Sequence, residues 1–202
     1  MKRSYIVLIT IILILLFDQV LKVWVKTNMM LGEEFSVIGN WFFIHFTENE
    51  GMAFGMTLGG GYGKLALSIF RIIAVILIGW YLFYLTKTKA HKGLIFSVSL
   101  VFVGALGNIV DSVIYGMIFS DSNFHSIAEF MPEAGGYGGF LHGKVVDMFY
   151  FPILQGTYPD WIPYKGGDPF IFFRPVFNIA DAAITTGVIT LIVFQRRFFK
   201  KD

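Results

Sequence analysis

The stretch FNIADAAITTGVITLIVF, at residues 177–194, is largely apolar but carries the carboxylate of Asp181 close to its start. Hydrocarbon cannot solvate a carboxylate, so an acid in an apolar segment is costly and indicates a functional site by default. Asp18 and Asp111 stand inside two other apolar segments, and Asp147 follows a pair of valines. These four acids are therefore the first candidates for the chemistry of the chain.

The composition of the chain is that of a membrane protein. Of its 202 residues, 55% are hydrophobic and only 15% are charged, whereas a soluble domain carries about 25% charged residues. The net charge of +2 and the absence of a basic stripe predict no nucleic-acid partner. The absence of cysteine excludes disulfides, a thiol nucleophile and a cysteine-based metal site.

Four segments approach the roughly 20 apolar residues that a helix needs to cross a bilayer. We predict one integral-membrane domain, residues 1–202, in which these segments are transmembrane helices. The predicted helices cover about residues 5–25, 65–85, 93–118 and 177–194, and the long connections are 26–64 and 119–176.

Basic residues predict the orientation of these helices. They flank the chain termini and the short connection between the second and third segments, so by the positive-inside rule both termini are cytoplasmic. The long connections then face the extracytoplasmic side of a bacterial inner membrane. Asp18 interrupts the first segment and no small-residue cleavage site follows it, so we expect an uncleaved anchor rather than a signal peptide.

The outer connections carry signs of local structure. Residues 35–47 are rich in β-branched and aromatic residues, which predicts short strands at the membrane surface. Glycine runs at 59–61 and 135–139 indicate tight turns or hinges. The predicted fold class is a membrane all-α protein with four transmembrane helices and an extracytoplasmic cap.

The predicted topology places the four acids at a similar depth. Asp18 and Asp111 lie roughly 10 Å below the outer ends of their helices, at a rise of 1.5 Å per residue. Asp181 lies roughly 6 Å below the mouth of the last helix by the same rise, and Asp147 approaches from the outer connection. We therefore expect all four in one shallow layer near the outer face.

Polar residues accompany the acids at helical spacing. Asn108 with Asp111, and Asn178 with Asp181, share a helix face, and an amide there can hold the rotamer of the carboxylate. Lys22 lies one turn from Asp18, and we expect these two to form a structural ion pair rather than a catalytic one. Asp111 has a similar alternative, because it could simply brace the end of its helix. The first turn of a helix also favours a carboxylate through its dipole, which is the structural alternative for Asp181.

The remaining chemistry points to a pair of acids. No serine–histidine pair or HExxH motif is present, and the four histidines are scattered, so we predict no metal and no cofactor. Two carboxyl groups in proximity share one proton. The ionised group can then activate a water while the protonated one polarises a scissile carbonyl. Position alone does not decide whether Asp111 or Asp147 is the partner of Asp181.

Two alternatives from other functional classes remain at this point. A proton- or cation-coupled transporter would use buried acids as a relay, but transporter sites prefer the bilayer midplane. A membrane scaffold without enzymatic activity would leave four costly carboxylates unexplained.

Five ordered motifs carry a resemblance to a known family. Together they span most of the chain, and the chain resembles the lipoprotein signal peptidases (signal peptidase II), bacterial membrane aspartic proteases. The motifs are DQVLK at 18–22, NEGMAFG at 49–55, GALGNIVD at 104–111, VVDM at 145–148 and FNIAD at 177–181.

The resemblance implies roles for individual residues. It makes Asp147 and Asp181 the catalytic dyad, and it gives a supporting or substrate-binding role to Asp18, Lys22, Asn49, Gly51, Asn108, Asp111 and Asn178. It further implies a membrane-embedded enzyme, expected as a monomer among membrane lipids. The expected substrate is a diacylglyceryl-modified prolipoprotein, cleaved just before its lipidated cysteine. A small β-cradle at 35–47 and a short surface helix within 53–64 are expected to cap the site.

The chain departs from the family pattern at two places. The family usually has arginine directly after the aspartate of the third motif, and here that position is Ser112. We consider Lys144 and Arg174 as replacements for this cation, and a different bracing of Asp111 as the alternative. The stretches 112–146 and 150–175 are also longer than the resemblance implies, which predicts an enlarged outer cap.

Overall fold

The computed structural model describes residues 3–50, 61–172 and 175–200. Within this part of the chain, four helices are long and apolar enough to cross a membrane, which confirms the predicted number and approximate positions of the spans. The helices are α1 (Arg3–Asn28), α2 (Gly61–Lys87), α3 (Lys92–Val110), which continues through the π-turn η2 (Asp111–Tyr115) into α4 (Gly116–Ile118), and α5 (Ile179–Phe198).

Glycines allow α3 and α5 to pack at short distance. A Cβ atom on Gly104 would lie 2.2 Å from the carbonyl oxygen of Ala180, and one on Gly187 would lie 2.7 Å from that of Ser97. Small residues at these points let the two backbones approach, as is common between membrane helices. The close approach brings the first turn of α5 against the outer half of α3.

The cap contains a four-stranded antiparallel sheet in the order β1-β2-β3-β6. The strands predicted within residues 35–47 are confirmed as β1 and β2. In the pairing of β2 with β3, Thr47 lies opposite Asp147, next to an irregularity in the register. The strands are β1 (Glu34–Ile38), β2 (Phe42–Asn49), β3 (Val145–Tyr150) and β6 (Val176–Phe177).

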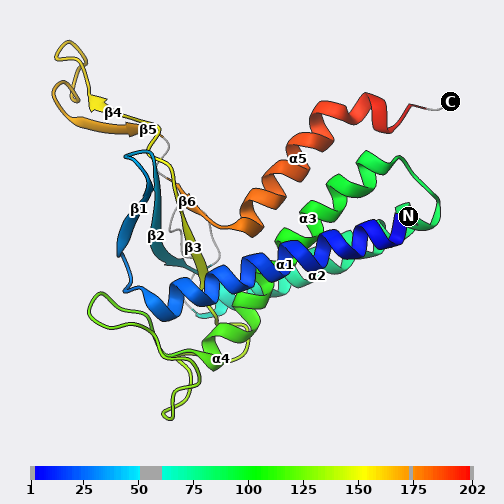
Figure 1. Cartoon of the computed structure of the whole chain (residues 1–202), viewed down its shortest axis with the longest axis horizontal. Helices are drawn as coiled ribbons and strands as arrows, with labels where there is room; N and C mark the ends of the chain where they lie inside the picture. Colours follow the sequence, from blue (N-terminus) through cyan, green and yellow to red (C-terminus); the bar gives the residue numbers. More distant parts are fainter. Residues whose placement is uncertain (1–2, 51–60, 173–174, 201–202) are drawn as a thin grey trace.

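Part of the enlarged cap is a second, separate sheet. Strands β4 (Leu154–Thr157) and β5 (Pro169–Phe172) pair only with each other. They form a hairpin that projects away from the helices (Figure 1). The surface helix predicted within 53–64 falls mostly on residues outside the described part of the chain, and residues 61–64 belong to α2.

An apolar core joins the sheet to the outer end of α1. Val25 of α1 and Met29, directly after the helix, pack with Phe46, Val146 and Met148 of the sheet, and all five side chains are almost fully buried. Removal of this much apolar surface from water is the main force that seats the sheet on the helices. Asp147 lies between two of these core residues, so its position is fixed relative to α1.

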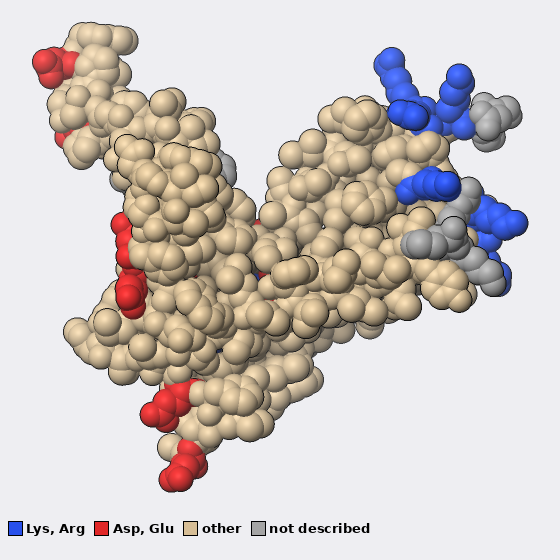
Figure 2. Space-filling view, viewed as in Figure 1, with Lys and Arg blue, Asp and Glu red and all other residues tan. Residues whose placement is uncertain are grey.

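On the face shown in Figure 2, basic and acidic surface residues lie at opposite ends of the molecule. Both termini lie at one end, where lysines and arginines gather, whereas the aspartates and glutamates on this face lie on the cap at the opposite end (Figures 1 and 2). The start of α1 and the end of α5 therefore lie on the same side of the molecule (Figure 1), and the cytoplasmic location of this side stays a prediction.

Candidate active site

Each of the four acids comes from a different element, and hydrogen bonds connect them. Asp18 lies on α1, Asp111 begins η2, Asp147 lies on β3 and Asp181 lies in the first turn of α5. Asp18, Asp111 and Asp147 are 1%, 0% and 5% exposed. Carboxylates this deeply buried need hydrogen-bonding or charged partners.

Asn178 is bonded to two of these acids. Its side-chain oxygen accepts a hydrogen bond from the backbone N–H of Asp181 at 2.8 Å, and the Asp181 carboxylate accepts one from the Asn178 N–H at 3.4 Å. This reciprocal pair is a capping box at the start of α5. The Asn178 amide also donates to Oδ1 of Asp147 at 2.8 Å. Asn178, the N-cap residue of α5, is thus hydrogen-bonded to both Asp147 and Asp181.

Two further asparagines orient the same pair of acids. Asn108 donates to Oδ1 of Asp181 at 2.8 Å, and its own side-chain oxygen accepts from Asn178 at 3.1 Å. Asn49 of β2 donates to Oδ2 of Asp147. The spacing predicts contact between Asn178 and Asp181, which the structure confirms. The pairing of Asn108 with Asp111 is wrong, because the Asn108 amide donates to Asp181 on the neighbouring helix.

Lys22 forms ion pairs with the other two acids, Asp18 and Asp111. Its ammonium lies 3.0 Å from Oδ2 of Asp18 and 2.8 Å from Oδ2 of Asp111, and all three side chains are at most 1% exposed. The predicted ion pair between Asp18 and Lys22 is confirmed. The other oxygen of Asp18 accepts from the Ala180 N–H at 2.9 Å, which ties α1 to the start of α5.

The Asp111 carboxylate accepts hydrogen bonds from donors on two other elements, α1 and β3. Besides Lys22, it accepts from Gln19 at 2.9 Å and from the backbone N–H of Val146 at 3.3 Å. Its carboxylate therefore holds α1, η2 and β3 together, which favours the bracing role. Asp147 is the acid that shares a hydrogen-bonded residue with Asp181.

Sequence reasoning gave no role to Gln19 or Tyr115. The Gln19 amide donates to Asp111, and its oxygen accepts from the Tyr115 hydroxyl at 3.2 Å. The signal was available for Gln19, because an amide beside Asp18 in an apolar segment needs partners of its own. Tyr115 carried no comparable local signal.

Burial changes the acidity of Asp147, which lies on β3 outside the spanning helices. Burial raises the pKa of Asp147 to about 7, and the negative charge of Asp181 adds to this effect. Hydrogen bonds from Asn49 and Asn178 and the charge of Lys22 oppose the rise. Asp147 therefore holds a proton at neutral pH far more often than an exposed aspartate does.

The cation expected beside Ser112 is not Lys144. The Lys144 ammonium instead lies 2.6 Å from Asp121 and 3.9 Å from Glu48, within the cap, so the expectation that it compensates for Ser112 is wrong. The Ser112 hydroxyl donates to the backbone carbonyl of Asn108 at 3.1 Å. Arg174, the other replacement considered, and Gly51 both lie outside the described residues.

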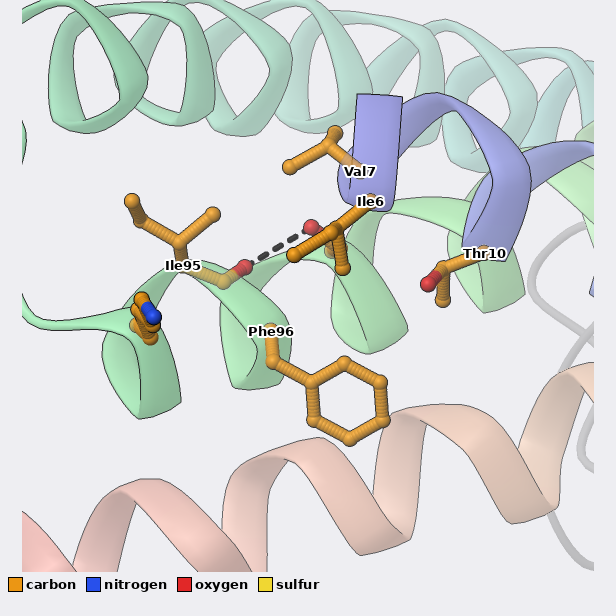
Figure 3. A pocket seen from close by; sticks show the side chains of 7 residues that line it. Ile6, Val7, Thr10, Ile95 and Phe96 are labelled. Carbon is orange, nitrogen blue, oxygen red and sulfur yellow. Dashed lines mark hydrogen bonds between the residues drawn. The ribbon is translucent and has the colours of Figure 1, made fainter. Parts of the chain in front are cut away.

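A notch and a small cavity differ in the polarity of the residues that line them. Figure 2 shows a notch between the cap and α5, with acidic atoms visible at its floor. A small cavity of about 30 Å³ lies between α1 and α3 near their basic ends (Figure 3). Ile6, Val7 and Phe96 are among the residues that line it, and the Ser99 hydroxyl beside it donates to the Ile95 carbonyl. Its lining is mostly apolar, so the notch is the candidate active site.

Among residues 3–50, 61–172 and 175–200, no group of three or more histidine, cysteine, aspartate or glutamate side chains is placed to hold a metal ion. The acids of the notch are engaged instead by amides and by Lys22.

Comparison with known proteins identifies the family. The sequence profile of signal peptidase (SPase) II matches residues 10–197. The chain belongs to the signal peptidase II family. A lipoprotein signal peptidase of Porphyromonas gingivalis is 49% identical over 198 residues, which cover 98% of this chain and 85% of that protein. One from Amoebophilus asiaticus is 40% identical over 189 residues, 92% of this chain and 75% of its own.

The fold agrees with the family assignment. A solved bacterial membrane enzyme superposes with a TM-score of 0.62 at 27% identity, over 97% of this chain and 92% of its own. A second such structure gives a TM-score of 0.60 at 28% identity, over 94% and 91%. The chain is therefore a multi-pass inner-membrane protease that removes signal peptides from prolipoproteins. The transporter and scaffold alternatives are not favoured.

Proposed function

We propose that this member of the family is an aspartic endopeptidase whose dyad is Asp147 and Asp181, and that it cleaves diacylglyceryl-modified prolipoproteins immediately before the lipidated cysteine. One observation carries the choice of dyad. Asn178 is hydrogen-bonded to both of these acids, whereas Asp18 and Asp111 are held by Lys22.

The buried environment of Asp147 assigns the proton that the two acids share. The raised pKa of Asp147 favours its protonated form near neutral pH. Two carboxyl groups in proximity share one proton. With that proton on Asp147, Asp181 is the base that activates a water, and Asp147 is the acid that polarises the scissile carbonyl.

The reaction then proceeds in two balanced steps. Asp181 takes a proton from water as the hydroxyl forms a bond to the carbonyl carbon, and Asp147 gives its proton to the carbonyl oxygen. In the resulting diol, Asp181 gives its proton to the amide nitrogen as the C–N bond breaks. Asp147 recovers a proton from the diol, and the products are a carboxylic acid and the free amine of the lipidated cysteine.

The position of the notch suits a substrate that is anchored in the membrane. It lies between the cap and the helices rather than at the outer tip of the cap (Figure 2). A signal peptide helix and an attached diacylglyceryl group would both remain in the bilayer while the scissile bond reaches the dyad. With both termini cytoplasmic, by the positive-inside rule, the notch faces the extracytoplasmic side.

The direct test is cleavage of a synthetic diacylglyceryl-modified prolipoprotein by the purified, lipid-reconstituted protein. Mass spectrometry of the products should place the cut immediately before the modified cysteine. Asp147→Asn and Asp181→Asn should each abolish cleavage, whereas Asp168→Asn, on the projecting hairpin, should leave it unchanged. Full activity in either dyad variant would refute the assignment. Proton flux into liposomes that is lost in Asp181→Asn would instead support a transporter.

A further inference from the structure

Arg71 stands out in α2 because it lies on the buried side of the helix. Ser68, Val75 and Leu82 are each at most 8% exposed, and their spacing marks the stripe that faces the rest of the protein. Arg71 falls on this stripe, one turn from both Ser68 and Val75, and is itself only partly exposed. A charged side chain is expensive at membrane depth and points to a partner in the protein interior.

The register of α2 against α3 places Arg71 at the level of the acids. A Cβ on Gly79 would lie 2.9 Å from the ring of Phe102, so these positions face each other. The two helices run in opposite directions. At about 3.6 residues per turn, roughly two turns toward the outer side lead from Gly79 to Arg71 and from Phe102 to the region of Asp111.

Hydrogen bonds to one loop confirm this level independently. The Ser68 hydroxyl donates to the Leu141 carbonyl at 3.2 Å, and the Gly143 N–H donates to the Ser112 carbonyl at 2.9 Å. The segment from Leu141 to Gly143 therefore contacts both the turn of α2 that precedes Arg71 and the start of η2.

The charges around Arg71 are those of the site. Burial costs the guanidinium solvation, and the carboxylates of Asp181, Asp111 and Asp147, in that order, attract it. Three lysines near the outer end of the helices form ion pairs with acidic side chains. Lys22 pairs with Asp18 and Asp111, Lys64 of α2 pairs with Glu50, and Lys144 pairs with Asp121.

Counting charges shows why a second cation is needed. Among the described residues four carboxylates share the layer, and even with one proton on the dyad, the charge of Lys22 leaves an excess of two negative charges there. Charges of one sign do not gather at low dielectric without compensation. The family motif supplies a cation directly after Asp111, where this chain has Ser112.

We propose that Arg71 is a positioning residue of the dyad, which supplies from α2 the positive charge that the family pattern places directly after Asp111. This inference rests on the proposed dyad. Its positive charge stabilises the dyad in the state that carries one proton and one negative charge. It acts through the charge of the site, and no bond to the substrate is required of it.

The test is the pH profile of prolipoprotein cleavage by Arg71→Gln, Arg71→Lys and Lys87→Gln in lipid. Without the cation, ionisation of the dyad requires a higher pH, so the acidic limb of kcat in Arg71→Gln should rise by about one pH unit or more. KM should change less than about twofold, because substrate binding does not use Arg71. Arg71→Lys should retain the wild-type limb, and so should Lys87→Gln, which removes a charge from the exposed inner end of α2.

A second readout separates this inference from the proposed function. Infrared titration of protein labelled with 13C at the aspartate carboxyl groups follows protonation without substrate. Arg71→Gln should shift this titration to higher pH, and Arg71→Lys should restore it. An unchanged titration and an unchanged kcat limb in Arg71→Gln would refute the role of Arg71 and leave the dyad standing. Activity that persists in Asp147→Asn would refute the dyad, and the infrared shift would still decide whether Arg71 controls the charge of the site.

Discussion

Replacement of Lys22 by methionine tests the charge arrangement that holds the helices around the site. Methionine is close to lysine in length and preserves most of its apolar packing. The change removes the ammonium that lies 3.0 Å from Asp18 and 2.8 Å from Asp111. It also removes a hydrogen bond of 2.9 Å to the side-chain oxygen of Asn108.

The expected loss is large because every partner is buried. Lys22 and Asp111 are 0% exposed and Asp18 is 1% exposed, so water cannot replace the lost partner. Removal of one member of a buried ion pair costs about 3–5 kcal/mol, chiefly because a charge is left uncompensated. Here two carboxylates lose the same cation, so we expect Lys22→Met to lower the free energy of unfolding by about 3–5 kcal/mol.

Unfolding of the purified protein in mixed micelles, with increasing denaturing detergent, measures this free energy. Lys87→Met, at the exposed inner end of α2, is the matched control and should stay within about 0.5 kcal/mol of wild type. Acidification should restore part of the lost stability in Lys22→Met, because protonation removes the charges left behind. If Lys22→Met is as stable as the control at neutral pH, the buried ion pair does not support the site and the reasoning is wrong.

Two further predictions concern the acidity of the dyad and the packing of its helices. The Asn49 bond favours ionised Asp147, so Asn49→Ala should raise the pKa of Asp147 above about 7 and move the alkaline limb of kcat to higher pH. An alkaline limb that stays in place would show that Asn49 does not control this acid. Gly104→Ala should destabilise the protein by about 1–3 kcal/mol, because its Cβ would lie 2.2 Å from the Ala180 carbonyl oxygen. Gly139→Ala, where a Cβ meets nothing within 4 Å, is the control, and equal stability of the two variants would argue against the close packing of α3 and α5.

The sequence predicts the four helices well because their signal is local. Length and apolar composition suffice for a helix in hydrocarbon, where each backbone group must be satisfied within its own segment. The strands within 35–47 follow similarly from β-branched and aromatic residues. The hairpin of β4 and β5 was not predicted, because pairing Leu154 with Phe172 across a long loop leaves no local pattern.

The candidate site was predictable in part, and its limits have a physical cause. Depth along each helix places Asp18, Asp111 and Asp181 in one layer, but depth carries no information about which side chains face each other. The rotation of α1 that directs Lys22 to Asp111 is set by packing between helices. Sequence reasoning could have found Arg71, since it is the only charged residue within 65–86.

The most direct test of the central claim compares three aspartate variants in one cleavage assay on the reconstituted enzyme. Asp147→Asn and Asp181→Asn should each lower kcat by on the order of 10⁴-fold while remaining folded, since acids that act as a unit are lost together. Asp111→Asn should lose stability but keep measurable activity in its folded fraction. If Asp111→Asn is inactive while folded and Asp147→Asn still cleaves, the dyad is formed by Asp111 and Asp181 and the account is contradicted.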